Sequence, residues 1–185
     1  MKLPIALALG LLAAPLMLAA PVAVEAQSDE EMARQMINDA NPSTFNLYGI
    51  NPAPKSVKDE SVQGGRALKV KLPGGGNPWD VGVSVPITKP VAAGDKIEMM
   101  FYAKLEKPAE GQAGGRIGAG IQLSKAPYSS FMTQNFDLTP EWKLYTLTGT
   151  ADKDYPAGSI NASFQLNTGK HMVALGIVAV FDKNK

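Results

Sequence analysis

The sequence predicts an all-β fold, an antiparallel two-sheet β-sandwich of the jelly-roll type, with a short N-terminal helix after a signal peptide. Three observations predict it. The 185 residues include 18 glycines and 14 prolines, and so many turn-forming, helix-breaking residues argue against a helical bundle. Eight segments alternate apolar and polar side chains with a period of two, and turn residues rather than helices separate them. The 45% of hydrophobic residues is enough to fill the core of one such domain.

The first 26 residues have the pattern of a signal peptide. Lys2 gives a positive start, an apolar run follows from Leu3 to Val24, and the spacing of Val24 and Ala26 predicts cleavage after Ala26. An uncleaved membrane anchor is the alternative, because the run is long enough to cross a bilayer. Cleavage predicts a periplasmic or secreted protein, with no further membrane span in the mature chain.

Residues 27–44 are expected to form a peripheral lead-in to the domain. Ser28 and Glu31 have the spacing of a capping box, which predicts a short helix that continues to about Asn38. Residues 45–185 are then expected to form one β domain. The strands are predicted at Arg66–Leu72, Trp79–Val85, Lys96–Leu105, Arg116–Leu123, Ser130–Leu138, Trp142–Thr150, Ser159–Leu166 and His171–Phe181.

Charge and composition exclude several classes of function. The formal net charge is +1, so the chain has no basic field for nucleic acid. It has no cysteine, which excludes disulfides, thiolate metal sites and cysteine nucleophiles. Its single histidine, His171, follows a turn and is expected at the surface, and it cannot build a multi-histidine metal site.

The outward faces of three predicted strands carry unusual side chains. One face presents Arg116 and Gln122 with two glycines between them, and another presents Asn161 and Gln165 with Ser163 between them. Interior glycines in a strand often mark the close approach of a ligand, and amides with a guanidinium suit a polyhydroxylated one. A third face carries Glu98 and Tyr102. A solvated sheet face with bulges at the glycines is the alternative interpretation.

Two aromatic residues near turns are further candidates for ligand contact. Trp79 follows a glycine-rich turn, where its ring could stack on a sugar, although strand parity aligns it with buried valines. Tyr128 lies in a loop or at a strand edge, where it could form the wall of a cleft. The candidate ligand-binding residues are therefore Trp79, Glu98, Tyr102, Arg116, Gln122, Tyr128, Asn161 and Gln165.

Residues from about Phe45 to Asp182 resemble a carbohydrate-binding module of the group that contains families 4, 9 and 22. The resemblance is carried, in the order of that group, by the segments Gly65–Val70, Trp79–Val83 with Pro86-Ile87, Val91–Ile97 with Phe101–Lys104, Leu138–Tyr145 and Phe164–Asn167. It implies a jelly-roll sandwich that binds a glycan along a concave sheet face and often carries a structural calcium ion. It also implies that Trp142 is a structural core residue and that Gln165 faces the binding cleft.

The leading hypothesis is thus a non-catalytic, exported protein that binds a polysaccharide or oligosaccharide. Two rivals stay open. The first is a structural or assembly module of the cell envelope that binds a protein partner. The second is a jelly-roll glycoside hydrolase or lyase, which needs two carboxyl groups across the scissile bond, for which Glu98 and Asp80 are the candidates.

Overall fold

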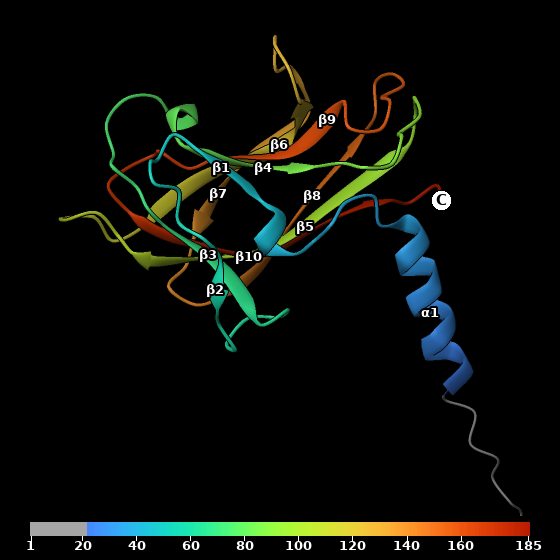
Figure 1. Cartoon of the computed structure of the whole chain (residues 1–185), viewed down its shortest axis with the longest axis horizontal. Helices are drawn as coiled ribbons and strands as arrows, with labels where there is room; N and C mark the ends of the chain where they lie inside the picture. Colours follow the sequence, from blue (N-terminus) through green and yellow to red (C-terminus); the bar gives the residue numbers. More distant parts are fainter. Residues whose placement is uncertain (1–21) are drawn as a thin grey trace, which may run out of the picture.

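The computed structural model describes the backbone of residues 22–185 and the side chains from Ser28 onward (Figure 1). Its elements in chain order are α1 (Val22–Gln35), the 3₁₀ turn η1 (Pro42–Thr44), β1 (Asn46–Tyr48), β2 (Val57–Lys58), β3 (Arg66–Lys71), the 3₁₀ turn η2 (Pro78–Asp80), β4 (Gly82–Pro86), β5 (Lys96–Lys107), β6 (Gly115–Leu123), β7 (Ser130–Leu138), β8 (Lys143–Thr150), β9 (Ile160–Gln165) and β10 (Met172–Asp182).

The strands form two antiparallel five-stranded sheets that face each other (Figure 1). One sheet has the strand order β1-β4-β9-β6-β7 and is called the groove sheet below; the other has the order β2-β3-β10-β5-β8 and is called the opposite sheet. The predicted all-β sandwich is confirmed. No helix among residues 22–185 is both long and apolar enough to cross a membrane.

The core between the sheets is filled by the apolar side of each alternating strand. An aromatic cluster at its centre joins the sheets: Phe101 of β5 makes edge contacts with Phe136 and Phe164 of the groove sheet and stacks on Tyr145 of β8. Such ring pairs add about 0.5–1.5 kcal/mol each beyond the burial of their area. The polar side of each strand is therefore held on the outer surface.

The predicted strands match the observed ones to within a few residues, with one informative exception. The strand expected over Trp79–Val85 begins only at Gly82, because Pro78 starts the 3₁₀ turn η2. Proline at the first position of a helical turn loses no hydrogen bond, so this turn is favourable there. The alternation that aligned Trp79 with the buried valines does not reach it, and its side chain is 57% exposed.

The N-terminal segment differs from the expectation in two ways. Helix α1 begins at Val22 and ends at Gln35, so Ser28 lies inside it rather than at its N-cap. The segment after the helix is not peripheral: Ile37 is fully buried, and the Asn38 side chain bonds the Val178 carbonyl and the Val180 amide of β10. The predicted signal peptide lies mostly outside the described residues.

The outer face of the opposite sheet is covered by a turn at residues 59–65. Val62 of this turn packs over Gly176, and the Trp142 indole donates a hydrogen bond of 3.1 Å to the Ser61 hydroxyl. The resemblance implied that Trp142 is a core residue, but it is half-buried on this outer face and does not lie between the sheets. The glycine at 176 leaves the space that Trp142 and Val62 fill.

Candidate functional site

Strand register places small and amide side chains together on the outer face of the groove sheet. One row across the strands runs from Tyr48 through Gly82, Gln165 and Gly118 to Asn135. The next row runs from Asn46 through Ser84, Ser163 and Gly120 to Thr133. A third row pairs Asn161 with Gln122. Directly opposed residues share one face of a sheet, so these rows form a single polar surface.

Two glycines leave space on this surface that a larger side chain would fill. A Cβ atom at Gly82 would lie 2.3 Å from the Tyr48 hydroxyl, and a Cβ atom at Gly120 would lie 2.3 Å from the Met132 carbonyl oxygen. The Tyr48 ring therefore lies across Gly82, where its hydroxyl hydrogen-bonds to Ser163. Burial raises the pKa of Tyr48, so the phenol stays protonated.

A groove of about 610 Å³ lies over this surface, and it is called the amide groove below. This volume is in the range of small-ligand sites. Its walls carry three exposed aromatic rings, Tyr48, Trp79 and Tyr128. The residues that line it are Tyr48, Trp79, Ser84, Gln122, Leu123, Ser124, Pro127, Tyr128, Asn161 and Gln165.

The floor of the amide groove offers unused hydrogen-bonding groups. The side-chain amides of Gln122, Asn161 and Gln165 are half-buried, and none bonds to another residue in the described part of the chain. Each amide has a carbonyl acceptor and two N–H donors. Among the described residues that line the groove none carries a charge. The groove can therefore bind a neutral ligand that both donates and accepts hydrogen bonds.

The Trp79 wall is held by a buried asparagine. Asn167 is 5% exposed; its side-chain oxygen accepts from the Gly74 amide at 3.1 Å, and its side-chain nitrogen donates to the carbonyls of Gly75 and Asn77. Its backbone amide also donates to the Pro78 carbonyl. These bonds hold the glycine-rich loop that leads into η2, and therefore the backbone that carries the exposed Trp79 side chain.

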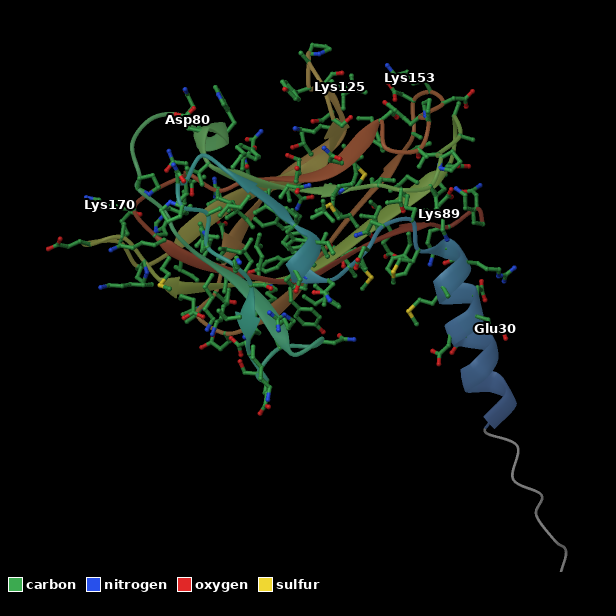
Figure 2. All side chains as sticks on the ribbon, in the orientation of Figure 1. Glu30, Asp80, Lys89, Lys125, Lys153 and Lys170 are labelled. Atoms are coloured by element: carbon green, nitrogen blue, oxygen red, sulfur yellow. The ribbon has the colours of Figure 1, made fainter. Side chains whose placement is uncertain are left out.

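The Tyr128 wall is a loop between β6 and β7 with an unusual backbone. Tyr128 has φ of +56°, in the left-handed region that bulky residues rarely adopt. Its backbone amide bonds to the Lys125 carbonyl at 3.0 Å, which closes the turn. Figure 2 labels Asp80 and Lys125, which belong to the turns that carry Trp79 and Tyr128; both turns rise on the same side of the sandwich.

The structure brings five of the eight sequence-predicted residues into one site. Trp79, Gln122, Tyr128, Asn161 and Gln165 all line the amide groove, although they come from η2, β6, β9 and a loop. Sequence reasoning missed Tyr48 and Ser84. Tyr48 lies on a strand of only three residues, too short for alternation to reveal, and an isolated serine carries no signal of its own.

The other three predicted residues lie elsewhere. Arg116 is on the same face of β6 as Gln122, but outside the groove, and its Nε donates to the Asp137 carboxylate at 2.7 Å. Glu98 and Tyr102 are on β5 of the opposite sheet, on the far side of the sandwich. The nearest cation to Glu98 is the Lys183 ammonium, 3.8 Å away.

The described residues offer no group of three or more histidine, aspartate or glutamate side chains that could hold a metal ion. The Lys185 ammonium contacts the Asp182 carboxylate and lies 4.0 Å from the Asp95 carboxylate. Calcium also accepts backbone and amide carbonyl oxygens as ligands, so the calcium binding that the resemblance implies stays a prediction.

Comparisons with known proteins agree with this architecture. No protein-family model matches the sequence, and no curated protein is significantly similar to it. Solved structures do match. The N-terminal cellulose-binding domain of Cellulomonas fimi β-1,4-glucanase C superposes with a TM-score of 0.57 at 23% identity, over 78% of this chain and 92% of that one.

Two further solved structures are similar. A family 4 carbohydrate-binding module gives a TM-score of 0.56 at 22% identity, over 77% of this chain and 96% of that one. The Clostridium thermocellum xylanase 10B structure, which contains a family 22 module and was solved with xylohexaose, gives 0.56 at 14% identity, over 81% of this chain and 29% of that one. The chain therefore has the jelly-roll fold of carbohydrate-binding modules of families 4 and 22, as the resemblance implied.

Proposed function

We propose that the protein is an exported, non-catalytic carbohydrate-binding protein that holds a neutral glycan chain in the amide groove. The observation that carries the proposal is the combination of exposed aromatic rings on the groove walls with three unpartnered amides on its floor. Sugar rings present C–H faces that stack on aromatic rings and hydroxyl groups that need donors and acceptors. The solved structures named above include a cellulose-binding domain and a module crystallised with a xylose oligomer, which supports a glycan as the ligand.

Each residue has a distinct part in this proposal. Trp79, Tyr48 and Tyr128 stack on successive sugar rings, while Gln122, Asn161 and Gln165 bond to their hydroxyl groups. Arg116 lies six residues from Gln122 on the same face of β6, about 20 Å along the strand. It would therefore contact only a chain several sugars long. Glu98 and Tyr102, on the opposite sheet, have no part in this groove.

A hydrolase or lyase would need ionisable groups where the glycan lies. Glycosidases place two carboxyl groups on either side of the scissile bond. Among the described residues that line the amide groove there is no aspartate or glutamate, and Glu98 stands on the other sheet. This supports binding without catalysis.

The experiment is retention of the purified protein on a panel of immobilised neutral polysaccharides, with calcium and with a chelator. We expect retention by at least one polymer class, and we expect Trp79→Ala to weaken it by about 2 kcal/mol, roughly thirtyfold, because central aromatic anchors dominate binding energy. Leu144→Ala removes an exposed apolar side chain from the opposite sheet and should leave retention unchanged.

Three results would contradict the proposal. The first is an absence of retention by every polymer, which would favour an envelope protein partner. The second is unchanged retention in Trp79→Ala and in the double variant Gln122→Ala/Asn161→Ala. The third is release of sugar from the polymer that disappears in Glu98→Gln, which would favour an enzyme. Loss of retention in the presence of the chelator would indicate that binding of the polysaccharide requires calcium.

A further inference from the structure

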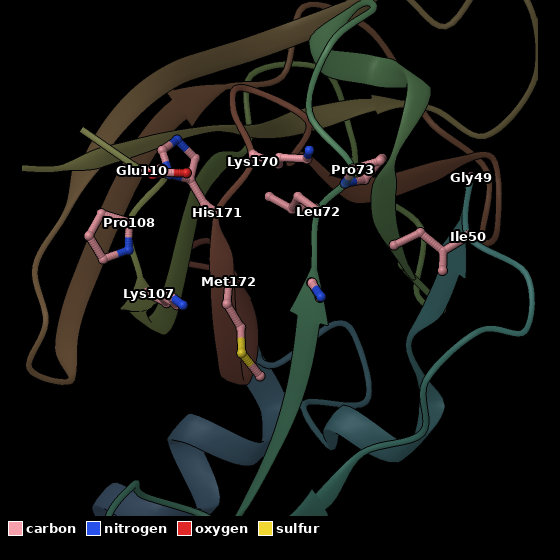
Figure 3. Close-up of a pocket in the computed structure, with 11 residues that line it drawn as sticks. Gly49, Ile50, Leu72, Pro73, Lys107, Pro108, Glu110, Lys170, His171 and Met172 are labelled. Atoms are coloured by element: carbon pink, nitrogen blue, oxygen red, sulfur yellow. The ribbon is translucent and has the colours of Figure 1, made fainter. Parts of the chain in front are cut away.

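A second cavity, of about 760 Å³, lies at the end of the sandwich where β1, β3 and β5 end and β10 begins, and it is called the lysine cavity below. Figure 3 shows Leu72 and Met172 in the middle of it, with Lys107 and Pro108 along one side and Ile50 along the other. Lys170, in the turn before β10, stands at the opposite end of the molecule from Lys89 and helix α1 (Figure 2). The cavity is separate from the amide groove and shares no lining residue with it.

The surface of the lysine cavity is mostly aliphatic. Leu72 is 1% exposed at its base, and Ile50, Pro73, Pro108 and Met172 complete the apolar wall. In contrast to the amide groove, its described lining contains no phenol, indole, side-chain amide or hydroxyl group. It therefore lacks the groups that stack on a sugar or bond to its hydroxyls.

Three lysines surround this apolar surface. Met172 pairs with Lys71 of β3 on one side and with Lys107 of β5 on the other, so the two lysines flank it on the same face of the sheet. Lys170 lies two residues before Met172 and also lines the cavity. The three ammonium groups give this lining a concentration of positive charge, which attracts an anion.

The three ammonium groups are unpartnered, unlike most lysines of the protein. Five lysines of the described chain make no ion pair, hydrogen bond or cation–π contact; they are Lys55, Lys71, Lys107, Lys125 and Lys170. Lys71, Lys107 and Lys170 all line the lysine cavity. Glu110 is the one acidic residue of the described lining, and it has no ion pair either. The cavity therefore keeps a positive excess.

His171 shapes the wall rather than adding charge. The sequence analysis expected it at the surface, but its side chain is only 3% exposed. Its Nδ1 accepts a hydrogen bond of 3.0 Å from the Ala109 amide, which ties the loop after β5 to the start of β10. Burial lowers the pKa of His171, so the imidazole stays neutral near pH 7.

We infer that the lysine cavity binds an amphiphilic anion, an aliphatic chain that ends in a carboxylate or a phosphate. The chain would lie over Ile50, Pro73 and Met172, which reach the surface, and the anionic head would lie among Lys71, Lys107 and Lys170. A mostly apolar pocket with a few charged groups that orient the ligand is the usual form of a small-molecule site. This site is independent of the amide groove, so the protein would hold a glycan and an acyl ligand at once.

The test is calorimetric titration of the full-length protein with four probes below their micellar concentrations. Dodecanoate and dodecyl phosphate carry both the chain and the anion, dodecanol carries the chain alone, and inorganic phosphate carries the anion alone. We expect the first two to bind and the last two to bind at least about tenfold more weakly. The triple variant Lys71→Gln/Lys107→Gln/Lys170→Gln should weaken binding of both anionic probes at least about tenfold.

The chain supplies a matched control and a second variant. Lys55→Gln/Lys125→Gln removes the other two unpartnered lysines and should leave binding unchanged. Met172→Glu places a carboxylate between two of the lysines and should abolish binding of dodecanoate. Equal binding of dodecanol and dodecanoate, undiminished binding in the triple variant, or no binding of either anionic probe would overturn the inference. An unchanged response to a retained polysaccharide in the triple variant would show that the two sites are separate.

Discussion

Tyr128 combines an exposed aromatic ring with a strained backbone. Its side chain is 58% exposed on the wall of the amide groove, and its φ of +56° costs about 1 kcal/mol for a residue that has a bulky side chain. Strain of this kind persists where the surrounding structure enforces it, and it is common at ligand sites. A ligand-binding role for the ring would account for a tyrosine at this strained position.

This account predicts opposite effects of one substitution on stability and binding. Asparagine tolerates the left-handed region, so Tyr128→Asn should raise the free energy of unfolding by up to about 1 kcal/mol. Glycan affinity should fall about threefold to tenfold because a stacking ring is lost. Thermal unfolding and calorimetry measure the two quantities. Tyr128→Phe is the control that keeps the ring, and equal affinity in both variants would contradict a stacking role.

At the scale of elements, alternation predicts strands well but does not predict which sheet each strand joins. Strands β5 and β6 both alternate apolar with polar side chains. The sequence analysis therefore placed Gln122 of β6 and Tyr102 of β5 in one candidate site. Strand pairing separates them, because β6 lies between β9 and β7 while β5 lies between β10 and β8. That pairing depends on contacts between residues far apart in the sequence, which no local pattern contains.

The turn at residues 59–65 makes a prediction about acid stability. Asp59 accepts hydrogen bonds from the Ser61 hydroxyl and from the Lys69 ammonium at 3.0 Å, and these partners lower its pKa to about 2. Because the pKa is lower in the folded state than in the unfolded state, the carboxylate stabilises the fold above about pH 4, and this stabilisation is lost as the pH falls towards about 2.

Asp59→Asn should therefore lower the free energy of unfolding near neutral pH by about 1 kcal/mol, a value that allows for screening by solvent at this surface turn. The difference from the wild type should disappear near pH 2. Thermal unfolding at both pH values measures it. Asp137→Asn, which removes an exposed carboxylate from the edge strand β7, is the control and should change little. An equal loss of stability at both pH values would show that the turn depends on the shape of the side chain and not on its charge.

At the scale of the whole molecule, the two cavities have opposite chemistry. The amide groove is aromatic and uncharged, and the lysine cavity is aliphatic and basic. The composition of the chain conceals this, because a net charge of +1 averages over both. The sandwich and half of the residues that line the amide groove were predictable from the sequence. The lysine cavity was not, because it forms where the ends of β3, β5 and β10 meet.

Because the described lining of the amide groove carries no charge, the proposed function predicts that glycan affinity does not depend on pH. Its ionisable groups are the phenols of Tyr48 and Tyr128, and burial raises the pKa of Tyr48 further. The association constant should therefore change less than about twofold between about pH 5 and pH 9. Calorimetry at three pH values in this range measures it. A bell-shaped dependence would indicate an acid and a base at the site, as in a hydrolase.

The central claim is that a glycan binds to the groove sheet, and the NMR signals of the two tryptophans can test it. Trp79 stands on the wall of the amide groove, and Trp142 lies on the outer face of the opposite sheet. Each indole N–H gives its own signal in a nitrogen-edited NMR spectrum, and Trp142→Phe assigns the pair. Titration with an oligosaccharide of the retained polymer should shift the Trp79 signal progressively and leave the Trp142 signal in place. A shift of the Trp142 signal alone would contradict the account, because it would put the glycan on the other side of the sandwich.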